Sequence, residues 1–219
     1  MKLIFIGMPG SGKGTQSELV AKRYSLPHIS TGDIFRDNIK AGTELGKKAD
    51  ALISKGRFVP DSITNKIVKK RIIEPDCKKG FILDGYPRNL VQTEFMEKNI
   101  GADFAIFIDI SDETAKNRIL GRYQCANCGK NYNIFTGPKP KKEAHCDSCG
   151  MPLIQRKDDS ETSFWHRMEI YHRLTEPIVS YYRDKGILIT VNGEQPVADV
   201  EKELEKKLEA EIKSKNIKN

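Results

Sequence analysis

The sequence contains no apolar run of the ~20 residues that a membrane-spanning helix needs. Its N-terminus also lacks the pattern of a secretory signal, because the first apolar run is short, has no cleavage-like site and leads directly into a glycine-rich loop. We find neither internal repeats nor low-complexity tracts. These absences predict a cytoplasmic protein with no membrane partner.

Cysteine is scarce, and the five cysteines are an odd number for a fully disulfide-bonded secreted domain. Hydrophobic residues make up 38% of the chain and charged residues 31%, which argues for a folded protein and against disorder. The net charge of +7 would suit a nucleic acid, a membrane surface or a small polyanionic substrate, and does not choose among them. Many lysines lie within residues 201–218 among glutamates, a pattern typical of a solvated helix face.

Short β-branched and aromatic runs alternate with amphipathic stretches, which predicts βαβ units in an α/β fold. We expect a parallel five-stranded sheet flanked by helices, with strands at residues 2–7, 27–29, 80–84, 104–110 and 187–191. All but 27–29 are nearly continuous in apolar character, as expected for strands covered on both faces. Two segments interrupt the alternation: the mainly helical residues 30–59, and residues 121–159. Both are predicted insertions at loops after strands, where α/β proteins place binding sites.

Residues 7–15 match the phosphate-binding pattern G-x-x-x-x-G-K, between a predicted strand and a predicted helix. Glycines let backbone N–H groups turn toward phosphate oxygens, the helix N-terminus adds partial positive charge, and Lys13 adds a full charge. Gly14 stands where a magnesium-binding Ser or Thr is usual. Asp84 ends an apolar strand at the position of a Walker B acid, and we expect it to orient Mg²⁺ through water. The predicted contacts to the nucleotide phosphates come from Gly10, Ser11, Gly12, Lys13, Gly14 and Thr15.

Four cysteines form two C-x-x-C pairs, Cys125 with Cys128 and Cys146 with Cys149. The segment between the pairs, residues 129–145, has a length inside the roughly 15–20-residue window of zinc sites. Each pair is followed by a glycine, which lets the chain turn so that amides point at sulfur. Four thiolates fill a tetrahedral site, so the predicted Zn²⁺ is structural. Disulfides, or iron or cobalt in place of zinc, stay open as alternatives.

Several motifs together resemble those of the adenylate kinase family. The glycine-rich loop, with Gly14 after Lys13, is similar to the family's phosphate loop. Residues 30–36 (S-T-G-D-I-F-R) resemble its AMP-binding segment, and residues 84–88 (D-G-Y-P-R), followed by Gln92, resemble its D-G-(F/Y)-P-R signature. Residues 118–122 and 156–159 look like the hinges of its lid. The sequence departs from the family pattern at Tyr123, where a second arginine is common, and at Asn133, where a histidine is common.

The resemblance covers residues 1 to about 200 and implies a P-loop kinase fold. Its core would span residues 1–29, 60–120 and 160–219, with a helical subdomain for the nucleoside monophosphate (NMP) over 30–59 and a zinc-bearing lid over 121–159. The implied activity is reversible, Mg²⁺-dependent phosphoryl transfer from ATP to AMP, giving two ADP and maintaining adenine nucleotide balance. The family also implies a monomer without a nucleic-acid partner.

The chemistry of this transfer favours positioning and charge neutralisation. The AMP phosphate is already an anionic nucleophile, so we expect no catalytic general base. Arginine suits the role because its planar fork stays charged and holds two phosphate oxygens. The predicted catalytic residues are Lys13, Arg36, Asp84, Arg88, Arg118, Arg122, Arg156, Asp158, Asp159 and Arg167.

By resemblance, Arg36 and Arg88 would hold the AMP phosphate, and the remaining arginines would close over the transferring group. Gln92 could pair with the amine and a ring nitrogen of adenine. The full predicted AMP set is Thr31, Arg36, Arg57, Phe58, Val59, Gly85, Tyr86, Pro87, Arg88, Gln92, Arg156 and Arg167. Beyond the phosphate loop, the ATP set adds Arg122, Asn131, Tyr132 and Gln195.

Two other functions stay open from the sequence. One is a kinase for another nucleoside monophosphate, or one that uses GTP to phosphorylate AMP, although compact pyrimidine-monophosphate kinases usually have a shorter lid than residues 121–159. The other is a nucleic-acid-binding ATPase with a zinc ribbon, supported by the +7 charge and the lysines near the cysteines. This ribbon has few aromatic residues for stacking bases, and the function leaves residues 84–88 unexplained.

Overall fold

The computed structural model describes residues 1–156 and 158–216. Its main sheet consists of β1 (Lys2–Ile6), β2 (His28–Ser30), β3 (Phe81–Asp84), β4 (Phe104–Asp109) and β8 (Leu188–Asn192). All pairings are parallel, in the order β2-β3-β1-β4-β8. The five predicted strands are therefore confirmed, each within one residue at either end.

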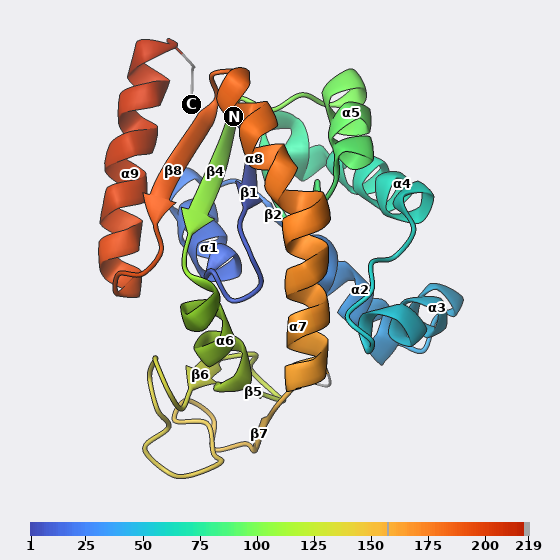
Figure 1. The fold of residues 1–219 in the computed structure, drawn as a ribbon, viewed down its shortest axis with the longest axis vertical. Helices are drawn as coiled ribbons and strands as arrows, with labels where there is room; N and C mark the ends of the chain where they lie inside the picture. The colour runs from blue at the N-terminus through green and yellow to red at the C-terminus, as the bar shows by residue number, and fades with distance from the viewer. Residues whose placement is uncertain (157, 217–219) are drawn as a thin grey trace.

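Helices cover both faces of this sheet, as the apolar strands predicted (Figure 1). Along β1, Leu3 packs with helices α1 (Lys13–Tyr24) and α9 (Val197–Ser214), while Ile4 packs with α4 (Asp61–Ile72), α5 (Leu90–Asn99) and α8 (Glu176–Asp184). The alternation follows from strand geometry, in which successive side chains point to opposite faces. On α9, buried residues recur every four positions from Val200 to Ile212, which leaves the charged residues in solvent.

The remaining core helices are α6 (Asp112–Leu120) and α7 (Glu161–Ile170), which flank the lid segment. A π-helical turn, η2 (Tyr171–Thr175), joins α7 to α8, and a 3₁₀ turn, η1 (Pro75–Lys79), precedes β3. Cys77 is buried in η1 against the core, so it has a packing role.

Within the residues described, no helix is both long and apolar enough to cross a bilayer.

The first insertion is a helical hairpin of α2 (Thr31–Lys40) and α3 (Glu44–Ile53). The Ser30 side chain accepts a hydrogen bond from the Asp33 N–H and so caps α2 directly at the end of β2; Thr43 caps α3 in the same way. The helices pack closely because Gly46 has no side chain, and a Cβ there would lie 2.1 Å from the Asn38 carbonyl oxygen.

The second insertion contains a small antiparallel sheet that the sequence did not predict. It consists of β5 (Arg122–Cys125), β6 (Asn131–Asn133) and β7 (Leu153–Ile154), in the order β6-β5-β7. The β4 and β8 arrows in Figure 1 point toward the end of the molecule that carries this sheet. The carboxyl ends of the parallel strands therefore face both insertions, which is the edge where α/β proteins bind ligands.

Candidate active site

A cleft opens at this edge, between the phosphate loop, the α2–α3 hairpin, the loop after β3, the segment that precedes α7, and the last turn of α7 with η2. Many residues predicted from the sequence line it together. They are Lys13, Thr31, Arg36, Arg57, Phe58, Val59, Gly85, Pro87, Arg88, Gln92, Arg156, Asp158 and Arg167. Tyr86 belongs to the predicted AMP set but does not face the cleft, because it is fully buried and its hydroxyl donates to Asn65 Oδ1.

The phosphate loop passes close to α6, which explains one of its glycines. Gly10 has φ +84, and a Cβ there would lie 2.9 Å from the Ala115 carbonyl oxygen. At the start of α1, Lys13 Nζ donates to the carbonyl oxygens of Gly7 at 2.6 Å and Met8 at 2.9 Å. Burial lowers the pKa of Lys13 to about 8, although the nearby Asp84 acts in the opposite direction.

Asp84 lies at the end of β3, beside the N-terminal turn of α1. Its Oδ2 is 3.5 Å from the point that a Cβ on Gly14 would occupy. The absence of a side chain at position 14 therefore leaves room in front of the carboxylate. Asp84 Oδ2 also lies 3.7 Å from His28 Nε2. Burial disfavours a charge on His28, but the hydrogen bond and negative charge of Asp84 leave the pKa of His28 above its usual value.

Buried arginines give the cleft a strongly cationic interior. Arg88 Nε donates to the Gly85 carbonyl oxygen at 2.7 Å, and its guanidinium lies 5.0 Å from the centre of the Phe58 ring. Burial, with other arginines close by, lowers the pKa of both Arg88 and Arg156 to about 10. Arg156 Nε is buried without a hydrogen-bond partner among the residues described. Arg36 bonds to Asp33 Oδ1 at 2.5 Å at the cleft's edge.

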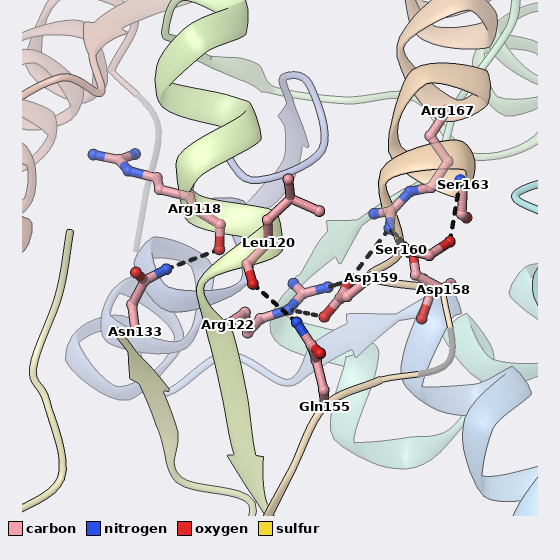
Figure 2. A network of polar contacts seen from close by, with 10 residues as sticks. All are labelled: Arg118, Leu120, Arg122, Asn133, Gln155, Asp158, Asp159, Ser160, Ser163 and Arg167. Atoms are coloured by element: carbon pink, nitrogen blue, oxygen red, sulfur yellow. Dashed lines mark hydrogen bonds and ion pairs between the residues drawn. The ribbon is translucent and has the colours of Figure 1, made fainter. Parts of the chain in front are cut away.

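Figure 2 shows how one arginine of the lid and one of α7 are held by the aspartates that precede α7. Arg122 donates two hydrogen bonds to the buried carboxylate of Asp159, at 2.8 and 2.5 Å. Arg167 Nη1 lies 3.1 Å from Asp158 Oδ2 and 3.6 Å from Asp159 Oδ1. Burial lowers the pKa of Arg167. Asp158 and Asp159, two of the three predicted catalytic aspartates, therefore orient cations.

Both arms of the lid also bind the end of α6 (Figure 2). Asn133 Nδ2 donates to the Arg118 carbonyl oxygen at 2.8 Å, and Gln155 Nε2 donates to that of Leu120 at 2.9 Å. These carbonyls have no partner inside the helix, so the two amides cap it. The Arg118 guanidinium instead donates to the carbonyl oxygens of Gly193 at 2.8 Å and Ser11 at 3.4 Å. Burial lowers its pKa.

The predicted contacts to the ATP base are less well supported. Tyr132 is 2% exposed and packs inside the lid, where its hydroxyl accepts from the Asp147 N–H at 2.7 Å. Its side chain faces the cysteines rather than the cleft, which corrects that expectation. Asn131 is exposed on β6, and Gln195 hydrogen-bonds Glu203 and the Asn192 carbonyl oxygen at the start of the α9 segment.

The four cysteine sulfurs of the lid all lie within 4.8 Å of one another. The closest pairs are Cys125–Cys149 at 3.4 Å and Cys128–Cys146 at 3.5 Å. Tetrahedral Zn²⁺ with Zn–S bonds of about 2.3 Å separates its sulfurs by roughly 3.8 Å, so the cluster fits that ion. All four cysteines are free, which argues against the disulfide alternative.

Hydrogen bonds also prepare the Cys146 sulfur to bind a metal. The Ser148 N–H donates to it at 3.4 Å and the Tyr132 hydroxyl at 3.5 Å. The tyrosine hydrogen bond lowers the pKa of the Cys146 thiol to about 6, which favours the thiolate that a metal requires. Gly129 and Gly150, with φ of +72 and +71, make the turns expected after each pair.

Some residues that support the site had no sequence signal. Thr175 donates to the Arg88 carbonyl oxygen at 2.8 Å from the π-helical turn, and Asp61 accepts a hydrogen bond from Gln92 at 2.7 Å. Each contact joins residues distant in the chain, so no local pattern marks it. Asp61 could have been noticed only as an acidic residue at the start of a helix.

A family model described as adenylate kinase matches residues 5–187. A curated "Adenylate kinase" from Acetivibrio thermocellus is 49% identical over 209 residues, covering 93% of this chain and 96% of that protein. One from Caldicellulosiruptor saccharolyticus is 46% identical, covering 96% of this chain and 100% of its own. One from Clostridium acetobutylicum is 48% identical, covering 91% of this chain and 95% of that protein.

Proposed function

The chain belongs to the adenylate kinase family, and we propose that its cationic cleft carries out the family's reaction through the residues described above. The protein is a phosphotransferase that moves a phosphoryl group from ATP to AMP, giving two ADP. The observation that carries the proposed site is the group of buried arginines with lowered pKa values. An anionic ligand would offset the cost of burying these cations close to one another.

On the acceptor side, we assign the AMP phosphate to Arg36, Arg88 and Arg156. Arg88 is already oriented by Gly85 and Phe58, so it needs little reorganisation to receive an anion. Arg156 has a free donor for a phosphate oxygen. Thr31, Val59 and Gln92 line the adjoining part of the cleft and would surround the acceptor base.

On the donor side, the amides of residues 10–15 and Lys13 would hold the ATP phosphates. Arg118 and Arg122 enter from the end of α6 and from the lid, and Arg167 from α7. Adenylate kinases are a standard example of enzymes whose lid closes over substrate. During closure Arg122 and Arg167 would exchange Asp158 and Asp159 for the transferring phosphoryl group, whose charge they neutralise.

Kinases of this family use the magnesium complex of the nucleotide. We place the ion near Asp84, whose carboxylate would orient its water ligands in the space left by Gly14. Bound there, Mg²⁺ would neutralise phosphate charge. We assign structural Zn²⁺ to the four lid cysteines, where it would hold the two C-x-x-C turns together.

Further parts of the proposal concern organisation. We propose a core of residues 1–29, 60–120 and 160–219, an NMP-binding subdomain of 30–59 and a lid of 121–159; residues 157 and 217–219 of these ranges lie outside the described part. We also propose a cytoplasmic monomer without nucleic-acid or membrane partners, because one chain supplies every residue of the assigned site. Light scattering that gives a dimer mass would contradict the monomer.

The substrate assignment is tested by ADP formation from ATP with AMP, CMP, UMP or GMP as acceptor. We expect AMP to give the highest kcat/KM by a wide margin. Replacing ATP with GTP should lower the rate. A preference for a pyrimidine acceptor would refute the assignment of the AMP site.

A further inference from the structure

The side-chain amide of Gln92 is held by two groups that select the same orientation. Gln92 lines the cleft but is only 2% exposed. Its Nε2 donates to Asp61 Oδ1 at 2.7 Å, and its Oε1 accepts from the Arg88 N–H at 2.8 Å. An ionised carboxylate can only accept and a backbone N–H can only donate. Both neighbours therefore exclude the orientation in which amide nitrogen and oxygen are exchanged.

Asp61 is itself held firmly by two helices. It is the first residue of α4, where the helix dipole favours a negative charge. Asn89 Nδ2 donates to Asp61 Oδ1 at 3.0 Å and Oδ2 at 3.1 Å. The same Asn89 caps α5, because its Oδ1 accepts from the Gln92 N–H at 2.7 Å. Asp61 thus keeps its position without any contribution from a ligand.

The orientation of the Gln92 amide matters because it decides which base the amide can read. After its bonds to Asp61 and Arg88, the amide retains one N–H donor and one acceptor lone pair. A 6-amino purine offers a donor at N6 and an acceptor at N1. A 6-oxo purine offers the reverse, an acceptor at O6 and a donor at N1. A freely rotating amide would pair with either base, whereas a locked amide matches only one.

We propose that Asp61 is a positioning residue that makes the acceptor site select 6-amino over 6-oxo purines, by locking Gln92 in one orientation. The inference rests on the proposed function, because it takes Gln92 as the residue that reads the acceptor base. A 6-oxo base in the locked site would place its N1–H donor against the Gln92 N–H donor and its O6 acceptor against the Gln92 oxygen. Buried mismatches of this kind discriminate strongly between substrates.

Asp61→Asn removes one of the two constraints while conserving shape. The new amide can present either oxygen or nitrogen to Gln92, so only the Arg88 N–H still opposes the exchanged orientation. Loss of a charge-assisted hydrogen bond corresponds to about a tenfold to hundredfold change. We expect the ratio of kcat/KM for AMP to that for IMP to fall by this factor. IMP is the sharpest probe because it differs from AMP only at positions 6 and 1 of the base.

The matched control is Asn65→Ala, on the same helix as Asp61. Asn65 accepts the Tyr86 hydroxyl at 2.8 Å and makes no described contact with the Gln92 amide. This variant should lower the melting temperature but keep the AMP-to-IMP ratio of the wild type. Asp61→Glu retains an acceptor-only carboxylate and should keep most of the selectivity. Equilibrium binding of AMP and IMP at low temperature gives the same comparison if Asp61→Asn is less stable.

The outcomes separate this inference from the proposed function. A wild-type enzyme without preference for AMP would refute the proposed function itself. A wild type selective for AMP, together with an Asp61→Asn ratio within about twofold of the wild-type ratio, would overturn the role of Asp61 alone. A parallel fall in the activities of Asp61→Asn toward AMP and IMP would also overturn that role, because a merely structural role predicts it. The same holds if Asn65→Ala changes the AMP-to-IMP ratio as much as Asp61→Asn does.

Discussion

Removing the Arg88 side chain should lower turnover strongly while leaving the free energy of unfolding nearly unchanged. Folding places this guanidinium in a buried site, where burial and the nearby Arg167 and Arg36 lower its pKa from its usual value to about 10. At 1.36 kcal/mol per pKa unit, the charged form costs the folded protein up to about 3 kcal/mol. The lost contacts work in the other direction: the Arg88 hydrogen bond to Gly85 and the stacking on Phe58 are each worth about 1 kcal/mol.

Arg88→Ala should therefore be as stable as the wild type, or more stable by about 1 kcal/mol. The Gly85 carbonyl oxygen keeps a partner, because the Thr31 hydroxyl also donates to it at 2.8 Å. Turnover should fall by about 10²–10⁴-fold, the range for removing an oriented cation or donor from developing phosphate or oxyanion charge. In this variant the pKa of Lys13 should rise part of the way toward its usual value, because Arg88 is one of the groups that lower it.

The assay combines ADP formation from saturating ATP and AMP with urea unfolding of the same preparations. Arg183→Ala, on the surface of α8 away from the cleft, is the control and should retain activity. Near-normal turnover of Arg88→Ala would refute the assigned role. A loss of stability as large as that caused by truncating a buried apolar side chain would refute the argument that burying the charged Arg88 side chain destabilises the folded protein.

The remaining predictions concern the metal centre and the phosphate loop. Cys125→Ser should lose zinc and lower the melting temperature more than it lowers activity at low temperature; unchanged zinc content by atomic absorption would remove the zinc assignment. Tyr132→Phe should bind the metal about 10–100-fold more weakly in chelator competition, because it loses a hydrogen bond to the Cys146 sulfur, whereas Tyr123→Phe should not. Burial lowers the pKa of Lys13 to about 8 in the folded protein, whereas the unfolded chain keeps the usual value of 10.5. Between these two pH values the unfolded chain binds more protons than the folded one, so the free energy of unfolding of the free enzyme should rise with pH. ATP phosphates should raise that pKa, so calorimetry near pH 8.5 should detect proton uptake on binding; equal values for the wild type and Lys13→Met would contradict this.

The main sheet could be predicted from the sequence because its strands are continuous apolar runs between helical patterns. The small lid sheet could not, since β5, β6 and β7 are short and carry mostly polar or partly exposed residues. Physical packing also overrode the role that resemblance gave to Tyr132. Its side chain is buried in the lid, in a cluster with Cys125, Cys146 and Leu153.

Much of the candidate site was predictable because phosphate chemistry leaves local motifs. Glycines, Lys13 and the arginines stand in short patterns that can be recognised along the chain. The groups that orient them cannot be found in this way. Asp61 acts on Gln92, and Thr175 on Arg88, across long sequence separations and through the tertiary fold. The same holds for Asn133 and Gln155, which bring both arms of the lid to the end of α6.

The most direct test of the account follows the γ-phosphate of ATP labelled at that position and mixed with unlabelled AMP. Direct transfer inside one cleft predicts that the label appears in the β-phosphate of ADP, with two ADP formed for each ATP consumed and no free phosphate. Without AMP, ATP should remain intact. Label released as inorganic phosphate, or retained on the protein after denaturation, would contradict the central claim.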